Sequence, residues 1–448
     1  MVGSTEIARG KRPSPRAALR QTFRALRNRN YRLFWSGQVI SSVGTWMQRI
    51  ALAWLVLKLT NSPLDLGLVT TFQTLPVLLF ALFGGVIADR VAKRRLLLVT
   101  QTTMLLQASV LALMTAAGFD NLYAIYLLAA ILGTANALDN PARQAFVKEL
   151  VGPDDVANAV ALNSIVFNTA RLIGPALGGV TIAAIGVTGC FTLNALSFLA
   201  VLGGLILMRP ADFYELARPP RGKVLRQIAE GVNYAVRTPD IALVLLLMLV
   251  IGTFGYNFTV ILPLIATYVL HAGPVGFGTL TSAMAIGSLL AAVGIAYSGR
   301  VSQRTLLAGA GGFSGLLLLL AISDRWPTTV AILIALGFAS IVFTATANSR
   351  LQLLAPPELR GRVMSLYTLL FLGSTPIGSL VIGTLADHQG VRLAVGELAL
   401  ICWVGVIAGL VYLHRQRARR PAPAPEGIHG APAPVLAAGE SGSPAGPE

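Results

Sequence analysis

Two arginines lie inside long apolar segments, where a charged side chain could bind an oppositely charged molecule. Arg49 lies within residues 33–58 and Arg171 within residues 157–185. Because a charge that faces hydrocarbon costs roughly 2.5–3.5 kcal/mol even on a lenient scale, each side chain should face a cavity or a partner. Together they could attract an anionic or catecholate-like molecule. The equally open alternative is that each arginine binds backbone carbonyls or joins neighbouring helices. Further candidates for lining the same cavity are Gln48, Asn163, Asn168, Tyr256 and Asn257.

An acid inside an apolar segment could carry protons. Glu397 lies within the apolar residues 391–413, and Asp139 lies at the edge of another apolar segment. A carboxyl group that faces a cavity can take up and release protons, because burial favours its neutral form. Glu397 is therefore the candidate proton carrier. The alternative is a peripheral position without this role.

The elements that hold these side chains are expected to span a membrane. Of the 448 residues, 54% are hydrophobic and 12% are charged, and the mean hydropathy is +0.69. Soluble domains carry about 25% charged residues, because a surface that faces water needs charge and one that faces lipid excludes it. A helix needs roughly 20 apolar residues to cross a bilayer. The apolar segments predict twelve such helices, at about residues 33–58, 65–88, 96–117, 122–143, 157–185, 189–208, 241–269, 276–299, 305–322, 327–350, 362–385 and 391–413.

The basic residues indicate how these helices are oriented. Of the 35 Lys and Arg residues, nine lie between Arg9 and Arg32, and others cluster at alternate connections. The intervening connections hold only Lys58, Arg325 and Arg392. This asymmetry is the positive-inside pattern, so we expect both termini in the cytoplasm. It also argues against a nucleic-acid partner, although the net charge is +16.

The predicted helices form two halves, residues 32–208 and 241–413. The spacing from Pro63 to Gly67 at the start of the second helix recurs from Pro274 to Gly278 at the start of the eighth. A faint repeat of this kind is typical of transporters that hold a substrate between two halves near the middle of the membrane.

Polar segments flank and separate the halves. Residues 1–31 form a basic cytoplasmic tail, and residues 414–448 end in a Pro-, Ala- and Gly-rich stretch that is expected to be disordered. Between the halves, residues 209–240 carry apolar side chains at helical spacing beside basic ones. This pattern predicts an amphipathic helix on the anionic lipids of the inner leaflet, and a solvated linker is the alternative. The apolar positions are Leu225, Ile228, Val232 and Val236.

Residues 85–95 place one acid and four cations between two apolar segments. This stretch resembles motif A of the major facilitator superfamily, the loop between helices 2 and 3. The resemblance implies a latch that closes the cytoplasmic side in the outward-open state. Ala92 stands where the pattern usually has a second glycine, and a degenerate copy at residues 298–304 lacks the acid. The latch residues would be Gly85, Asp89, Arg90, Lys93 and Arg94.

Gly174, Pro175, Gly178 and Gly179 resemble motif C of the drug-exporting members of the superfamily. The proline removes one backbone hydrogen bond and kinks its helix. The glycines would let this helix pack closely against helix 8. The resemblance implies export, although Ala170 replaces the upstream glycine of the motif.

Asp139 and Arg143 belong to a third pattern, Asp-Asn-Pro-Ala-Arg-Gln at residues 139–144. With residues 30–35 and 360–363, it resembles the superfamily branch that contains the enterobactin exporter and macrolide-efflux proteins, over about residues 25–415. Asp139 and Arg143 are one helical turn apart and can pair. We expect them to form an inner-gate ion network with Asp89. A local pair at a helix end is the equally open alternative.

Enzyme signatures are absent from the sequence. The four histidines form no His-x-x-x-His pair, and neither a Cys/His metal spacing nor a phosphate-binding glycine loop occurs. We therefore expect no metal, no cofactor and no direct ATP hydrolysis. Cys190 and Cys402 are expected to be structural thiols, and no cleavable signal peptide is expected.

Together these patterns predict an all-α integral membrane protein with the major facilitator fold, twelve transmembrane helices in two six-helix halves, in the plasma (inner) membrane. The predicted function is secondary active export of a small amphiphilic molecule, such as a drug, a siderophore or another metabolite, by alternating access. Coupling to a proton gradient is implied by the resemblance, and we expect a monomer. The alternatives are a lipid or lysolipid flippase, a nutrient importer, a transport-inactive sensor or scaffold and, last, a membrane enzyme.

Overall fold

The computed structural model describes residues 21–214, 224–298 and 302–419. Within these ranges, the description leaves out the side chains of residues 81–90, 224–229, 372 and 416–419. The predicted tails 1–31 and 414–448 therefore lie mostly outside the described residues. The described residues are almost entirely helical and contain no strand.

The first half of the chain forms five long helices. They are α2 (Arg29–Thr60), α3 (Pro63–Arg90), α4 (Lys93–Ala116), α5 (Leu122–Val151) and α6 (Val156–Leu207). Side chains cap α2 and α5, since Asn28 accepts a hydrogen bond from Tyr31 N and Asn121 accepts one from Ala124 N.

α6 is a helical hairpin that crosses the bundle twice. Gly186 interrupts it with φ 74° and ψ 178°, a conformation that is open to glycine and strained for other residues. Cys190 Sγ lies 3.6 Å from the carbonyl oxygen of Gly178 twelve positions earlier, so the two arms run side by side. Among the described residues, 11 stretches are long and apolar enough to cross a membrane. Because α6 counts twice, they supply twelve crossings, and the fold prediction is confirmed.

The second half is less regular. Its helices are α7 (Val224–Arg237), α8 (Pro239–Val250), α9 (Phe258–Leu264), α10 (Pro274–Ser298), α11 (Gln303–Ile322), α12 (Trp326–Leu354), α13 (Pro357–Leu372), α14 (Thr375–Gln389) and α15 (Val391–Arg419). The π-helical segment Ile251–Gly255 leads from α8 towards α9, and the π-helical segment Ile265–Val269 continues α9, so Pro239–Val269 is one crossing. α13 and α14 make another crossing, which is interrupted at Gly373 and Ser374.

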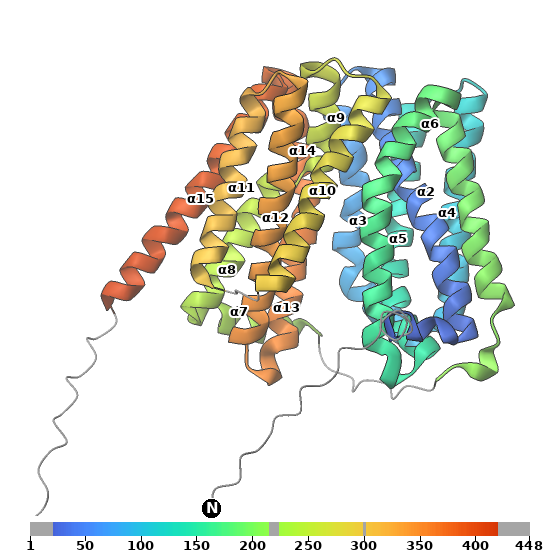
Figure 1. Ribbon diagram of the computed structural model, residues 1–448, viewed down its shortest axis with the longest axis horizontal. Helices are drawn as coiled ribbons and strands as arrows, with labels where there is room; N and C mark the ends of the chain where they lie inside the picture. Colours follow the sequence, from blue (N-terminus) through green and yellow to red (C-terminus); the bar gives the residue numbers. More distant parts are fainter. Residues whose placement is uncertain (1–20, 215–223, 299–301, 420–448) are drawn as a thin grey trace, which may run out of the picture.

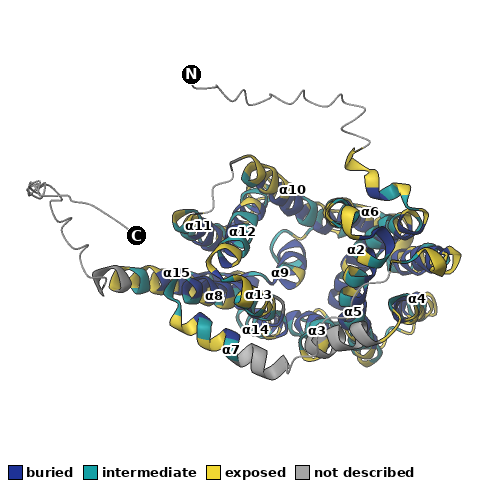
Figure 2. Ribbon diagram, turned by 90° about the horizontal axis from the view of Figure 1, so that it is seen from below, coloured by how far each residue is buried: buried dark blue, intermediate teal, exposed yellow. Residues whose placement is uncertain are grey.

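Figure 1 shows α2–α6 on one side of the molecule and α8–α15 on the other. We call the end of the bundle that carries residues 61–62, 271–273 and 390 the closed end; it is at the top of Figure 1. There α3 packs against α14, because Gly67 and Gly383 lack side chains. A Cβ atom on Gly67 would lie 2.6 Å from the Ser379 carbonyl oxygen and 3.1 Å from Gly383 Cα. Figure 2 shows the two groups of helices from the opposite end.

Within the described residues, five hydrogen bonds join the two halves, and all of them lie between the closed end and the middle of the bundle. They are Ser62–Asp387, Leu64–Asp387, Thr71–Pro376, Asn61–Tyr268 and Leu172–Ser282. The halves are therefore held together asymmetrically.

The linker between the halves contains α7, which lies beside the second half. Glu230 and Arg362 of α13 form an ion pair with 2.5 Å between Oε2 and Nη1. Val232 and Val236 are exposed. The side chains of Leu225 and Ile228 lie outside the described residues, so the amphipathic face and its docking on lipid stay a prediction.

Candidate functional site

Arg49 and Arg171 lie close together between α2 and α6. The Arg49 guanidinium packs over the ring of Trp46, with Cζ 4.5 Å from the ring centroid. The Trp46 ring meets Phe167 edge-on, with 6.1 Å between centroids. Phe167 lies one turn before Arg171 on α6, and the charges of the two arginines are near enough to interact. These four side chains form what we call the arginine cluster.

Arg171 also faces the second half of the molecule. Its charge interacts with the phenol of Tyr256, which lies between α8 and α9. The carbonyl oxygen of the next residue, Leu172, accepts a hydrogen bond of 2.8 Å from Ser282 of α10. The arginine cluster therefore lies where the two halves meet near the middle of the bundle, and the structure brings Arg49, Arg171 and Tyr256 together.

Tyr256 belongs to an aromatic group in the second half. Its hydroxyl donates a 2.6 Å hydrogen bond to the Ser340 carbonyl oxygen of α12, which orients the ring. The ring stacks on Phe313 with 5.1 Å between centroids, and it meets Phe371 edge-on at 5.0 Å. One side of the site is therefore aromatic and held in place.

Neither arginine of the cluster has an acidic partner in the described part of the chain. The ion pairs found there join other residues, and no described residue accepts a hydrogen bond from either guanidinium. The cation–π contact with Trp46 compensates Arg49 only partly. An arginine keeps its proton at every physiological pH, so the cluster carries two positive charges that suit an anionic ligand.

Two of the predicted cavity residues lie elsewhere, and this is a correction. Gln48 is buried inside the first half, where its amide donates to Gln107 of α4 at 3.0 Å and accepts from Asn194 of α6 at 2.7 Å. Asn257 is fully buried and donates to the Thr253 carbonyl oxygen. Both amides are used in packing between helices, so neither side chain lines the site in this conformation.

The other two predicted polar residues lie on α6. Asn163 is partly buried and accepts a 3.2 Å hydrogen bond from the Tyr31 hydroxyl of α2, two turns away from Arg171. Asn168 is exposed and donates to the Ser164 carbonyl oxygen of its own helix. Asn168 lies one turn before Leu172, whose carbonyl faces α10, so it stays a candidate for lining the site.

Asp139 is deeper in the bundle than the sequence indicated. α5 continues to Val151, so Asp139 lies about 18 Å from that helix end rather than at an edge. Its carboxylate is fully buried and pairs with Arg143, whose side chain is 29% exposed. It also accepts hydrogen bonds of 2.8 Å each from Thr100 and Gln101 of α4.

Sequence reasoning missed the partners of this ion pair. Arg143 donates a 3.0 Å hydrogen bond to Gln38 of α2, so one network links α2, α4 and α5. The Oε1 atom of Gln101 is buried and has no donor in the described residues. Polar residues in apolar helices were the available signal, because a membrane-spanning helix keeps such residues only where they find partners.

The motif A prediction is only partly described. Three residues of the motif, Gly85, Asp89 and Arg90, lie in the stretch 81–90, whose side chains are not described. Lys93 pairs with Glu149 of α5 at 2.8 Å, and Arg94 donates to the carbonyl oxygens of Leu205 and Ile206 at the end of α6. These two cations therefore bind α5 and α6 of the first half.

The motif C glycines pack mainly against α2. A Cβ on Gly174 would collide with Trp46, and one on Gly178 would lie 3.1 Å from Met47 Cα. Gly179 instead faces Pro274 and Val275 of α10. The eighth predicted helix is α10, so the expectation that the glycines pack against it holds for Gly179. At Gly174 and Gly178 the neighbour is α2, the first helix, so that Trp46 of the arginine cluster packs against α6.

Glu397 faces outward, so the prediction that it is a cavity-facing proton carrier is wrong for this conformation. It is exposed on the same face of α15 as Leu393, Leu400 and Val404, which are 63%, 54% and 65% exposed. This apolar face suits lipid. Glu397 accepts a 2.6 Å hydrogen bond from Gln389 near the closed end.

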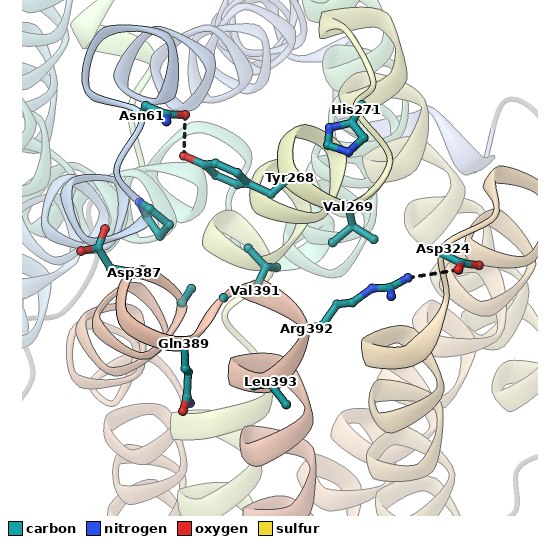
Figure 3. Close-up of a pocket in the computed structure, with 13 residues that line it drawn as sticks. Asn61, Tyr268, Val269, His271, Asp324, Asp387, Gln389, Val391, Arg392 and Leu393 are labelled. Carbon is teal, nitrogen blue, oxygen red and sulfur yellow. Dashed lines mark hydrogen bonds and ion pairs between the residues drawn. The ribbon is translucent and has the colours of Figure 1, made fainter.

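A pocket of about 680 Å³ opens at the closed end between the two halves. Figure 3 shows Tyr268 directed at Asn61 and Arg392 directed at Asp324 around it. The Tyr268 hydroxyl donates to Asn61 Oδ1 at 3.1 Å, and Arg392 Nη2 lies 3.4 Å from Asp324 Oδ2. Asp387, also on the rim, binds the start of α3. The contacts of Tyr268 and Asp387 join the two halves, whereas the Arg392–Asp324 pair lies within the second half.

Known proteins resemble this chain over nearly its whole length. Residues 20–430 match the transmembrane secretion effector family. The staphyloferrin A transporter of Staphylococcus aureus is 26% identical, over 82% of this chain and 93% of its own. The multidrug efflux pump Tap of Mycolicibacterium fortuitum is 28% identical, over 84% of this chain and 94% of its own. The enterobactin exporter EntS of Escherichia coli is 26% identical, over 88% and 94%.

Solved structures show the same fold. A bacterial homolog of the human lysosomal transporter Spinster, in an inward-facing and unoccupied conformation, superposes with a TM-score of 0.69 at 12% identity, covering 88% of this chain and 99% of that one. The transporter PepTSo of the POT family superposes with a TM-score of 0.70, also at 12% identity and with the same coverage.

The family match spans far more than half of the chain, and the relatives and neighbours are transporters, not enzymes. This chain therefore belongs to the transmembrane secretion effector family of the major facilitator superfamily and is a multi-pass membrane transporter of a small-molecule substrate.

Proposed function

We propose that this protein exports a small amphiphilic molecule by alternating access. The observation that carries the proposal is the arginine cluster, which lies near the middle of the bundle between two halves that are joined only towards one end in the described residues. A site in this position can be opened first to one side and then to the other if the halves rock about it.

The positive-inside distribution supports an orientation with both termini in the cytoplasm. The closed end then faces the outside, and the described conformation is inward-facing. The arginine cluster would receive its substrate from the cytoplasm. The plasma (inner) membrane is the expected location, and the division into halves at residues 32–208 and 241–413 is part of the same proposal.

Export requires the closed end to separate. The hydrogen bonds from Ser62 and Leu64 to Asp387 would break, and the contact between Gly67 and Gly383 would open. The cytoplasmic ends would then meet, and the motif A residues around Asp89 would act as the latch of that state. Lys93 and Arg94, through α5 and α6, hold this loop against the first half. The two conformations need to differ by only a few kcal/mol.

A proton gradient is the proposed energy source, and Asp139 takes the place of Glu397 as the acid. On protonation, the Asp139 carboxyl group would become a hydrogen-bond donor. Gln101 Oε1, which has no partner in the described residues, could accept this bond after the Gln101 amide has rotated. Arg143 would then be released from its ion pair. The inner-gate role of Asp139 and Arg143 is thereby linked to coupling.

The names of the relatives support a substrate such as a siderophore or a drug. The motif C glycines support export over uptake. Anionic lipids of the inner leaflet are the proposed partners of α7, and a monomer contains the whole site.

The test is the accumulation of a panel of labelled amphiphiles and siderophores in efflux-deficient cells, with and without a protonophore. We expect the protein to lower accumulation of at least one compound and the protonophore to restore it. If no compound responds while the protein is present in the membrane, export is contradicted. Movement of labelled lysolipid between leaflets would then favour a flippase, and no movement of any probe would favour a transport-inactive sensor.

A further inference from the structure

We propose that the substrate is an aromatic organic anion and that its export moves net negative charge outward, so that the membrane potential drives it. This inference rests on the proposed function, because it assigns a charge to the molecule that the arginine cluster carries. It goes beyond that function by naming a substrate class and a driving force.

The charge of the site is the first step. Arg49 and Arg171 interact with each other, and no acid of the described residues pairs with either. Two neighbouring guanidinium groups repel each other and remain charged. A ligand with a carboxylate, sulfonate or phenolate offsets that repulsion, and a guanidinium group can bind two oxygens of one anionic group through paired hydrogen bonds.

The second step is that aromatic side chains surround the two arginines. Trp46 and Phe167 lie beside the arginines from the first half, and Tyr256 approaches from the second. Tyr256 is held by Ser340 and stacked on Phe313, so its ring is a fixed wall. Aromatic walls around a double cation suit a ligand that combines a ring with negative charge.

The third step is that no described acid lies where it could neutralise the ligand. Asp139 is enclosed by Thr100, Gln101 and Arg143 in the first half, and Glu397 lies on the outward face of α15. The remaining described acids lie towards the helix ends, such as Asp65, Glu149 and Asp387. Within the described residues, the site therefore offers no carboxyl group that could give the ligand a proton, and the ligand leaves as an anion.

Charge movement follows. A cell interior is negative, so an anion gains free energy when it leaves. At a potential of about 100 mV the gain of about 2.3 kcal/mol per charge corresponds to a concentration ratio of about 50. A proton that enters in exchange would add to this charge movement and not cancel it.

The experiment uses the purified full chain in liposomes with two probes of similar size. Naphthalene-2-sulfonate is an anion at every pH, and N-methylquinolinium is a cation. Potassium gradients with valinomycin set a potential of either sign, with equal pH on both sides. We expect saturable sulfonate flux that reverses with the sign of the potential and exceeds quinolinium flux at least tenfold.

Variants connect the flux to the site. Arg171→Leu should lower sulfonate flux at least tenfold, and Arg171→Lys should lower it less, because the charge stays although the paired hydrogen bonds are lost. Arg392→Leu is the matched control, since Arg392 lies at the closed end outside the cluster. Calorimetric binding of the sulfonate to each variant in detergent shows whether the site itself is intact.

The outcomes separate this inference from the proposed function. Equal flux of the two probes, or no binding and no flux of the sulfonate, would overturn the anionic substrate class. Sulfonate flux that ignores the potential and follows an imposed pH gradient would overturn the charge movement. Binding of the sulfonate without flux of any compound would instead overturn transport, and with it the proposed function.

Discussion

Asp387 accepts a hydrogen bond of 3.0 Å from the hydroxyl of Ser62, although 325 positions separate the two residues. The same carboxylate oxygen lies 3.5 Å from Leu64 N at the start of α3. A carboxylate of the second half therefore sits at the positive end of a helix in the first half, where it satisfies free backbone N–H groups. This contact exists only while the closed end is closed.

Replacing Asp387 with Asn should favour opening of the closed end, because the negative charge at the start of α3 is lost. The reporter is Thr71→Cys in a background without Cys190 and Cys402, since Thr71 Oγ1 binds Pro376 across the halves. We expect about a two- to fivefold faster reaction of this cysteine with an impermeant maleimide, in line with the roughly 0.3–1 kcal/mol that a negative charge contributes at a helix start. Asp324→Asn, in the same pocket but paired within the second half, should leave the rate unchanged. Equal rates for Asp387→Asn and the unmutated background would mean that the contact does not hold the end closed.

Replacing Gly67 with Val should prevent closure, because even its Cβ would lie 2.6 Å from the Ser379 carbonyl oxygen. The backbones of α3 and α14 would have to separate, so flux should fall at least tenfold while membrane abundance stays similar. Gly203→Val is the matched control, because nothing lies within 4 Å of a Cβ at Gly203. Flux and abundance are measured together in cells. Normal flux in Gly67→Val would show that this close packing is not needed for transport.

Replacing Asp139 with Asn should lower both stability and flux. Removing one partner of a fully buried ion pair costs about 3–5 kcal/mol, and the cost should be smaller here because Arg143 is 29% exposed. Thermal unfolding in detergent measures the effect. The double variant Asp139→Asn with Arg143→Gln should recover much of the stability but not the proton dependence of flux. Unchanged unfolding in Asp139→Asn would exclude a stabilising pair.

Replacing Glu397 with Gln should leave flux within about twofold of the unmutated protein. Glu397 is exposed on an apolar face of α15, and a Gln side chain can still accept the hydrogen bond from Gln389. Flux under a pH gradient is the measurement. A severe loss of flux at normal abundance would restore Glu397 as the proton carrier.

Replacing Asp89 with Asn should reduce flux without changing abundance, because the latch of the outward-open state would be weakened. Lys93→Gln is a useful comparison, since it breaks the pair with Glu149 within the first half. Flux and membrane abundance in efflux-deficient cells are the measurements. Unchanged flux in Asp89→Asn would mean that Asp89 does not act as a latch.

The sequence predicted the number and order of the crossings well, because long apolar stretches and alternating basic connections are strong signals. Helix ends were harder. The fourth crossing was predicted to stop at residue 143, but α5 reaches Val151 through a more polar stretch. Asp139 therefore appeared to be at an edge. The breaks around Tyr256 and Gly373 were also missed, since the π-helical segment before Tyr256 and the turn at Gly373 and Ser374 depend on neighbouring helices.

The site was predicted in part. Arg49 and Arg171 were found because isolated charges stand out in an apolar segment, and the structure brings them together. Gln48 and Asn257 looked equivalent in sequence but are buried between helices. The apolar residues of α2 are spread around the helix in the sequence, so no apolar periodicity separates cavity-facing from neighbour-facing polar side chains. Trp46 and Phe167 were missed because aromatic residues are ordinary in membrane helices.

The most direct test of alternating access is a pair of distance measurements by pulsed electron resonance. Spin labels at Tyr123 and Arg325 report on the closed end, and labels at Asp154 and Glu358 report on the opposite end; all four side chains are exposed. When a transported compound binds, we expect the first distance to lengthen in the molecules in which the second shortens. If both distances stay unchanged for every compound that the protein transports, the halves do not alternate about the arginine cluster.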